Sequence, residues 1–189
     1  MKIFTIALAA LAMFTTGASA QVPVVVGPRN VKINKIQPAV VKTPEFSVNI
    51  ANKRSESLSW FEFEVEFEVD GVEMVDELTF NYSVLFNNKL CVGEITYVNI
   101  PKGKDHYSVM YLSPRSLDRL TGGKPVNAGM LENIKVEIKK SGQLLTEKSQ
   151  SPKPLPNVQQ MPGLLVPKSE TPFQVLWWDR YEAVKPGSK

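Results

Sequence analysis

Cysteine and histidine are nearly absent from this chain. Its 189 residues include one cysteine, Cys91, and one histidine, His106. A single cysteine cannot form a disulfide within the chain, so the fold must rest on its hydrophobic core. Cys91 lies among apolar neighbours in NKLCVGE and is expected to behave as a small buried hydrophobic residue. An intermolecular disulfide in an oxidising compartment is the alternative.

The same shortage argues against an enzyme. A histidine-ligated metal site needs a cluster of ligands, and a Ser-His-Asp triad would have to use His106. A nucleophilic pair of Cys91 and His106 is conceivable, but both lie in strand-like sequence with no further support. GxSxG, GxGxxG and P-loop patterns are missing. The sequence therefore predicts a protein that is not an enzyme and has no catalytic residues, cofactor or metal site.

Long hydrophobic runs are also missing, except at the N-terminus. Residues 1–20, MKIFTIALAALAMFTTGASA, combine Lys2, an apolar run and small residues before Gln21. This layout predicts a secretory signal peptide that is cleaved after Ala20. An uncleaved anchor is the alternative, although a membrane span needs roughly 20 apolar residues. We expect an exported protein in the periplasm, at the outer membrane or outside the cell, with no transmembrane segment after cleavage.

Excess charge of one sign is missing as well. The chain carries 22 Lys and Arg against 19 Asp and Glu, a net charge of +3. Removing Lys2 with the leader lowers this to 3 − 1 = +2. So small a balance gives no electrostatic preference for nucleic acid or for acidic lipid.

Alternation of apolar and polar residues dominates what remains. It predicts strands at residues 31–36, 45–50, 60–69, 77–86, 94–100, 106–112, 133–140 and 172–181. Asp70-Gly71 is a strong two-residue turn signal, and residues 101–105 read as a hairpin loop. One helix of about two turns is expected after Ser113, with Pro114 at its first position and Gly122 at its end.

A proline-rich connection precedes the last predicted strand. Residues 149–172 contain six of the 14 prolines. Because the connection also carries several apolar residues, we expect it to lie against the domain rather than to be a free linker. The predicted fold is an all-β, immunoglobulin-like antiparallel β-sandwich with one short helix and this long connection. Residues 21–182 would form the single domain, and residues 183–189 a flexible tail.

Four glutamates form a row on the strand at residues 60–69. Glu62, Glu64, Glu66 and Glu68 share one face, while the other face is Phe, Phe, Val, Phe and Val. A straight row does not converge on one point as calcium ligands must. The favoured interpretation is a solvated face whose charges are offset by Lys135 and Lys139 on a neighbouring strand. A strip for a basic partner is the alternative.

Two apolar surfaces are candidates for binding. Trp177 and Trp178 are adjacent on the last predicted strand and would face opposite sides, with Arg180 on the side of Trp178. One tryptophan should enter the core, and the other is either covered by the proline-rich connection or exposed. Residues 106–112 have two apolar faces, which indicates a central strand or a subunit contact. The candidate partner or ligand residues are therefore Trp178, Arg180, Tyr107 and Tyr111.

Three stretches, WFEFEVEF, HYSVMYLSPRSLDRL and PFQVLWWDRYE, carry a resemblance. Over roughly residues 30–182 the chain resembles secreted immunoglobulin-like proteins of gut Verrucomicrobia that are encoded beside type IV pilus machinery. The resemblance implies a non-enzymatic, extracytoplasmic protein that is associated with a pilus or the outer membrane and forms a homo-oligomer. It does not imply a pilin, because the apolar run ends at a cleavage site and does not continue as a long helix.

Two functional hypotheses follow. The first is a structural or interaction protein of the cell envelope, accessory to type IV pilus assembly or adhesion, which binds protein partners or itself. The alternative is a secreted carbohydrate-binding module that uses exposed tryptophan and tyrosine side chains, including Trp60. A planar aromatic platform would favour the alternative, whereas a flat apolar patch or an open strand edge would favour the first.

Overall fold

The computed structural model describes residues 26–45 and 57–187. The predicted leader and nearly all of the strand expected at residues 45–50 lie outside these ranges, as do residues 188 and 189. The elements in chain order are β1 (Val31–Lys42), β2 (Ser59–Phe86), β3 (Lys89–Leu112), α1 (Pro114–Thr121), η1 (Ala128–Met130), β4 (Leu131–Lys140), β5 (Gln143–Ser149), β6 (Gln160–Pro162), β7 (Leu165–Pro167), η2 (Lys168–Glu170) and β8 (Ala183–Val184).

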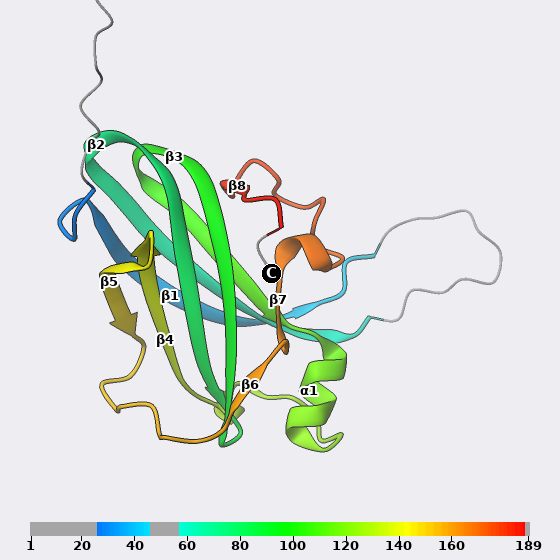
Figure 1. The fold of residues 1–189 in the computed structure, drawn as a ribbon. Coiled ribbons are helices and arrows are strands. Elements are labelled where there is room, and N and C mark those ends of the chain that lie inside the picture. Colours follow the sequence, from blue (N-terminus) through cyan, green and yellow to red (C-terminus); the bar gives the residue numbers. More distant parts are fainter. Residues whose placement is uncertain (1–25, 46–56, 188–189) are drawn as a thin grey trace, which may run out of the picture.

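Two long strands, β2 and β3, form the frame of the molecule. They pair with each other along nearly their whole lengths, and the ladder shifts register between Phe67 and Met74. Figure 1 shows both ribbons bending back on themselves at this end of the molecule. Gly71 has a φ of 75°, a left-handed conformation that glycine adopts without strain. The chain therefore bends at Asp70-Gly71, but it does not make the two-residue hairpin turn that this pair predicts, because β2 continues through it.

The two arms of each long strand do not pair as hairpins. They face each other across the core, and the rings of Phe67 and Phe80, both in β2, lie 4.9 Å apart. The hairpin expected between residues 94–100 and 106–112 is therefore wrong, because each of these segments pairs with β2 instead. Local turn signals predicted the reversals but not which segments would be hydrogen-bonded.

Bending turns one hydrogen-bonded sheet into two layers. The first layer contains β1, residues 59–69 of β2, residues 106–112 of β3, and β7. The second contains β5, β4, residues 74–86 of β2, residues 89–101 of β3, and the short β6 and β8. All pairs are antiparallel except β3 with β6. The predicted all-β, immunoglobulin-like sandwich is confirmed.

Alternation along the strands places the core between the layers. The apolar face predicted for residues 60–69 is buried, and Phe63, Val65 and Phe67 have no exposed surface. The ring of Phe61 in the first layer meets the edge of Phe86 in the second at 5.5 Å. Fully burying one such side chain contributes about 1.5–3 kcal/mol. Cys91 is also fully buried and unpaired, as expected of a small hydrophobic residue.

The short helix forms as its capping residues predict. The backbone N–H of Ser116 donates to Ser113 Oγ at 3.1 Å, and Pro114 occupies the first turn. Gly122 ends α1 with a φ of 67°. Leu117 and Leu120 are buried against the sandwich.

The proline-rich connection lies along β3, which would otherwise be an open edge in both layers. β6 pairs with residues 90–92, and β7 pairs with residues 110–112. Leu164 and Leu165 are buried. A Cβ on Gly93 would lie 2.8 Å from Leu165 Cβ, so this close approach requires glycine.

The strand expected at residues 172–181 is wrong. Backbone hydrogen bonds there close tight turns, from the Leu176 N–H to the Phe173 carbonyl and from the Arg180 N–H to the Trp177 carbonyl. Trp177 has a φ of 48°, a left-handed rather than an extended conformation. The last strand is instead the two-residue β8.

Candidate binding surface

A turn-rich segment covers part of the outer face of the first layer. We call residues 171–182 the C-terminal strap. Phe173 anchors it: its ring is stacked on Tyr111 with centroids 5.0 Å apart and meets Trp60 edge-on at 5.6 Å. All three side chains are buried. The strap thereby covers the second apolar face of residues 106–112, for which a subunit contact was one prediction.

The strap also pairs with the glutamate row. Arg180 donates to Glu64 from Nε at 3.0 Å and from Nη2 at 2.7 Å, and Tyr181 donates its hydroxyl to the same carboxylate at 2.7 Å. Burial alone would raise the pKa of Glu64, but these hydrogen bonds leave the pKa below its usual value. The middle of the row is therefore a docking point for the strap.

The predicted partners of the row are wrong. Lys135 bonds Glu137 and Glu147 at 2.9 Å, and Lys139 bonds Glu137 at 3.0 Å. These lysines lie on β4, which pairs with the second arm of β2 rather than with the arm that carries the row. Only the end of the row follows the expected pattern, since Glu68 meets Lys32 of the neighbouring strand β1 at 3.3 Å.

Tyr111 lies beneath the strap instead of on a free surface. Its hydroxyl donates to Glu62 at 2.8 Å, and its side chain is fully buried. Burial raises the pKa of Glu62, opposed by this hydrogen bond, and the nearby charge of Glu64 raises it further. Tyr111 therefore supports the strap and cannot contact a partner directly.

Two other predicted residues are brought together. The Arg180 guanidinium carbon lies 3.6 Å from the centre of the Tyr107 ring, a cation–π contact. Because Arg180 also holds Glu64, its charge is already matched within the chain. Tyr107 and Arg180 fix the strap in place, which leaves Trp178 as the predicted residue that faces outward.

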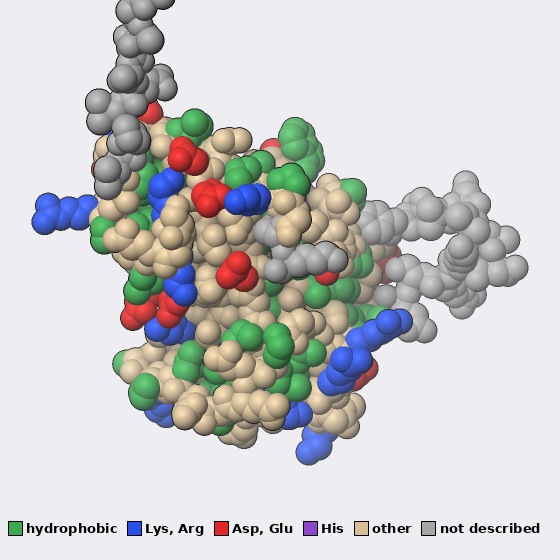
Figure 2. Space-filling view, in the orientation of Figure 1, with side chains coloured by type: hydrophobic (Ala, Val, Ile, Leu, Met, Phe, Trp, Pro, Cys, Tyr) green, Lys and Arg blue, Asp and Glu red, His purple; other side chains and the backbone are tan. Residues whose placement is uncertain are grey.

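Both tryptophans are exposed, so the expectation that one enters the core is wrong. Trp177 is 56% exposed and Trp178 79% exposed, beside Val175 at 64%. Phe173 fills the core position instead. Figure 2 shows hydrophobic side chains gathered at the upper end of the visible face, where Figure 1 draws the strap beside β8.

The turn that carries these side chains is fixed at both ends. Lys168 Nζ approaches the carbonyls of Gln174 and Trp177 at 3.4 and 3.5 Å. At the far end, the Glu182 carboxylate accepts a hydrogen bond from His106 Nδ1 at 2.7 Å. The Lys185 backbone N–H donates to the Thr96 carbonyl at 2.8 Å. The exposed tryptophans therefore sit on a braced turn. Sequence reasoning missed these anchors, because each joins residues far apart in the chain, as Glu182 with His106 and Arg180 with Glu64 show.

A small cavity opens beside Trp178. Its volume is about 160 Å³. Its wall is formed by Gln174, Trp178, Tyr181 and Glu182 of the strap, by Lys168 and Ser169 of η2, and by Ile95, Tyr97, Val109 and Val184 of the strands. It combines an exposed indole with several polar side chains.

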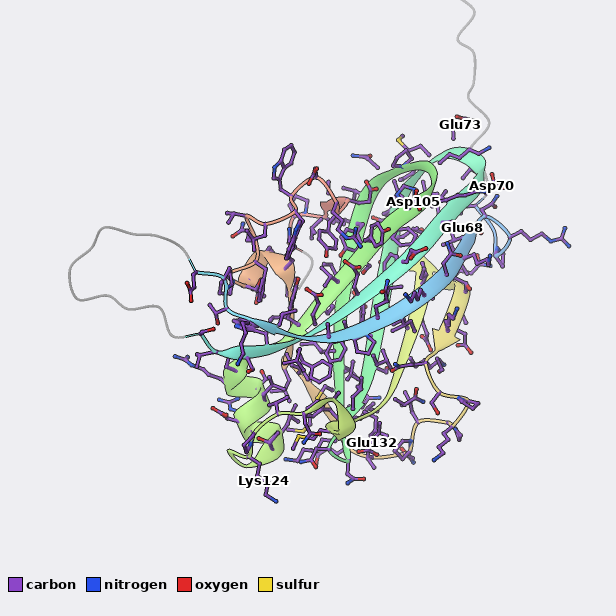
Figure 3. All side chains as sticks on the ribbon, turned by 180° about the vertical axis from the view of Figure 1, so that it is seen from behind. Glu68, Asp70, Glu73, Asp105, Lys124 and Glu132 are labelled. Atoms are coloured by element: carbon purple, nitrogen blue, oxygen red, sulfur yellow. The ribbon has the colours of Figure 1, made fainter. Side chains whose placement is uncertain are left out.

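Other features of the surface suit a ligand less well. A larger cavity of about 680 Å³ opens by β3, β6 and β7, and its wall carries the carboxylates of Glu94, Glu137 and Glu170 but no tryptophan. Figure 3 shows Glu68, Asp70, Glu73 and Asp105 near the end where β2 and β3 bend, and Asp70 is paired with Lys102 at 3.2 Å. Within residues 26–45 and 57–187, no group of three or more His, Cys, Asp or Glu could hold a metal ion. No helix in the described ranges is long and apolar enough to cross a membrane.

Fold and surface together define an immunoglobulin-like β-sandwich with a C-terminal strap that displays tryptophan. A protein-family model matches residues 24–187, and the chain belongs to that family. A crystal structure from Akkermansia muciniphila, a gut bacterium of the Verrucomicrobia, matches with a TM-score of 0.71 and 24% sequence identity. The match covers 82% of this chain and 93% of that one. The resemblance to proteins of gut Verrucomicrobia is thus confirmed, and at this identity the match establishes the fold. No curated protein matches the chain.

Proposed function

We propose that the chain is an exported, non-enzymatic protein of the cell envelope that works by binding a partner or further copies of itself. The observation that carries this proposal is the pair of exposed tryptophans on a braced turn. A large apolar side chain that is exposed to water contributes favourable free energy only when a partner covers it. Tryptophan is enriched among the residues that contribute most to binding.

The cell-envelope setting has separate support. The leader-like N-terminus favours export, and the family and its Verrucomicrobial relative agree with the resemblance to proteins encoded beside type IV pilus machinery. Within this proposal the chain is an accessory of pilus assembly or of adhesion, in the periplasm, at the outer membrane or outside the cell.

Light scattering on the exported chain over a concentration series tests self-association. We expect an oligomer that persists in reductant, because Cys91 is buried and burial raises the pKa of its thiol to about 11. Trp178→Ala should shift the equilibrium toward monomer, whereas Asp179→Asn, an exposed neighbour on the same turn, should leave it unchanged. A monomer at every concentration would contradict self-association and leave binding of a different partner.

A carbohydrate-binding module is the second candidate. It is favoured by one specific observation, the cavity beside Trp178, whose wall combines apolar with polar side chains. Export and the absence of catalysis are common to both candidates, so they differ only in what covers the tryptophan.

A further inference from the structure

We infer that the cavity beside Trp178 binds one sugar ring of a glycan, with the pyranose face against the indole. This inference rests on the proposed function, since the glycan would be the partner that the strap serves. The size of the cavity, the groups in its wall and the contacts that hold those groups support it.

The size of the cavity suits a single ring. Pockets for drug-sized ligands have volumes of about 300–1,000 Å³. At about 160 Å³ and open to solvent along Trp178, this cavity takes one ring and leaves the rest of a chain outside.

The indole provides the apolar contact that a sugar requires. The face of an aromatic ring carries negative charge density. The axial C–H bonds on one face of a pyranose are weakly positive and apolar, so that face stacks on an indole while the hydroxyl groups point sideways. Trp178 is 79% exposed and lies in the wall of the cavity, whereas Trp177 does not line it.

Polar groups share the wall of the cavity with the indole. Ser169 and Gln174 line the cavity, and neither side chain makes a hydrogen bond within the described part of the chain. Glu182 lines it too, with one carboxylate oxygen held by His106 at 2.7 Å, which leaves the other positioned as an acceptor. Such groups orient a ligand rather than supply most of the affinity.

Charge selects a neutral ligand over an ionic one. The Lys168 ammonium and the Glu182 carboxylate both line the cavity. Their opposite charges offset each other, so the wall gives no net attraction for a cation or for an anion. A neutral polyol meets both with hydrogen bonds, accepting from the ammonium and donating to the carboxylate.

Saturation-transfer NMR on the purified, exported chain tests the inference. The probes are the methyl glycosides of glucose, galactose, mannose and N-acetylglucosamine, each at about 10 mM, ten times a millimolar dissociation constant. At least one should receive saturation, strongest on the protons of one pyranose face. Trp178→Ala should weaken binding at least about tenfold, the effect of losing a central aromatic contact. Gln174→Ala should weaken it less.

Trp177→Ala is the matched control, because it removes an exposed indole from the same turn but not from the cavity. It should leave sugar binding unchanged, whereas non-specific adhesion to apolar surface would fall equally in both variants and overturn the inference. A lack of transfer from all four probes would also overturn it. Light scattering on the same variants distinguishes glycan binding from the proposed self-association. Self-association that depends on Trp178, in a protein that binds no sugar, would reject the glycan and support a protein partner.

Discussion

At the scale of single residues, Glu64 differs from Glu68 although both belong to the same row on β2. Glu64 receives three hydrogen bonds from the strap, while Glu68 meets an exposed lysine. We expect Glu64→Gln to lower the free energy of unfolding by about 1 kcal/mol. This is less than hydrogen bonds to charged groups usually contribute, because the Arg180 side chain is 39% exposed and solvent screens its charge. Glu68→Gln should change it by less than about 0.5 kcal/mol. Urea unfolding of both variants measures the difference, and equal losses would contradict the special role of Glu64.

The lowered pKa of Glu64 predicts a dependence on acid. A carboxyl whose pKa falls on folding adds stability above its unfolded value of about 4.3, and that stability is lost as pH falls through the folded pKa. The destabilisation caused by Glu64→Gln should therefore be full at pH 7 and shrink below about pH 4. The pKa of Glu62 is raised by burial and also by the charge of Glu64, so removing that charge relieves Glu62 and offsets part of the destabilisation. A difference that stays constant from pH 7 to pH 3 would show that the Glu64 carboxylate is not paired.

Gly93 is a residue whose importance is steric. A Cβ there would lie 2.8 Å from both Leu165 Cβ and Met110 Cε, on either side of the close contact between β3 and β7. We expect Gly93→Ala to cost about 1–3 kcal/mol, the usual range for overpacking. Gly27→Ala is the control, because its Cβ would meet only a side-chain atom at 3.9 Å. Thermal unfolding followed by circular dichroism compares the two, and an equal effect would refute the steric argument.

At the scale of elements, the strap depends on Phe173. This side chain is buried between Trp60 and Tyr111, so Phe173→Ala should cost about 3–5 kcal/mol by leaving a cavity. Val175→Ala, at an exposed position of the same strap, should stay within about 0.5 kcal/mol. Hydrogen exchange of the Val109 to Leu112 amides would report the loss locally. Unchanged protection in Phe173→Ala would mean that the strap does not depend on this anchor.

The strap also marks where prediction from sequence ended. Alternation along PFQVLWWDRY fits a strand, yet the same spacing of apolar residues occurs in a series of turns with Phe173 inside and both tryptophans outside. The decisive contacts, from Phe173 to Tyr111 and from Arg180 to Glu64, join residues more than 60 positions apart and leave no local pattern. The helix after Ser113 and the inward face of residues 60–69 were predictable, because capping and period-two burial are local effects. The same limit explains why the candidate surface was predicted as Trp178, Arg180, Tyr107 and Tyr111 without the roles that separate them.

At the scale of the whole molecule, the two layers share their central strands. β2 and β3 each run through both layers, and side chains cross between them: the Val109 N–H donates to the Tyr97 hydroxyl at 3.1 Å, and the hydroxyls of Tyr82 and Ser108 lie 2.7 Å apart. One layer cannot unfold without pulling apart strands of the other. We therefore expect a single transition, with far-ultraviolet circular dichroism and tryptophan fluorescence changing together.

Tyr97→Phe tests this coupling, because it removes one hydroxyl between the layers and leaves the ring in place. The Val109 N–H loses its partner in a buried site, at a cost of about 1–3 kcal/mol. Since the bond joins the layers, both spectroscopic transitions should move to lower urea by the same amount. Fluorescence reports Trp60 in the first layer and the two tryptophans of the strap that covers it. A variant in which fluorescence shifts alone would show that the layers unfold separately and that the bend in β2 and β3 is a hinge between two units.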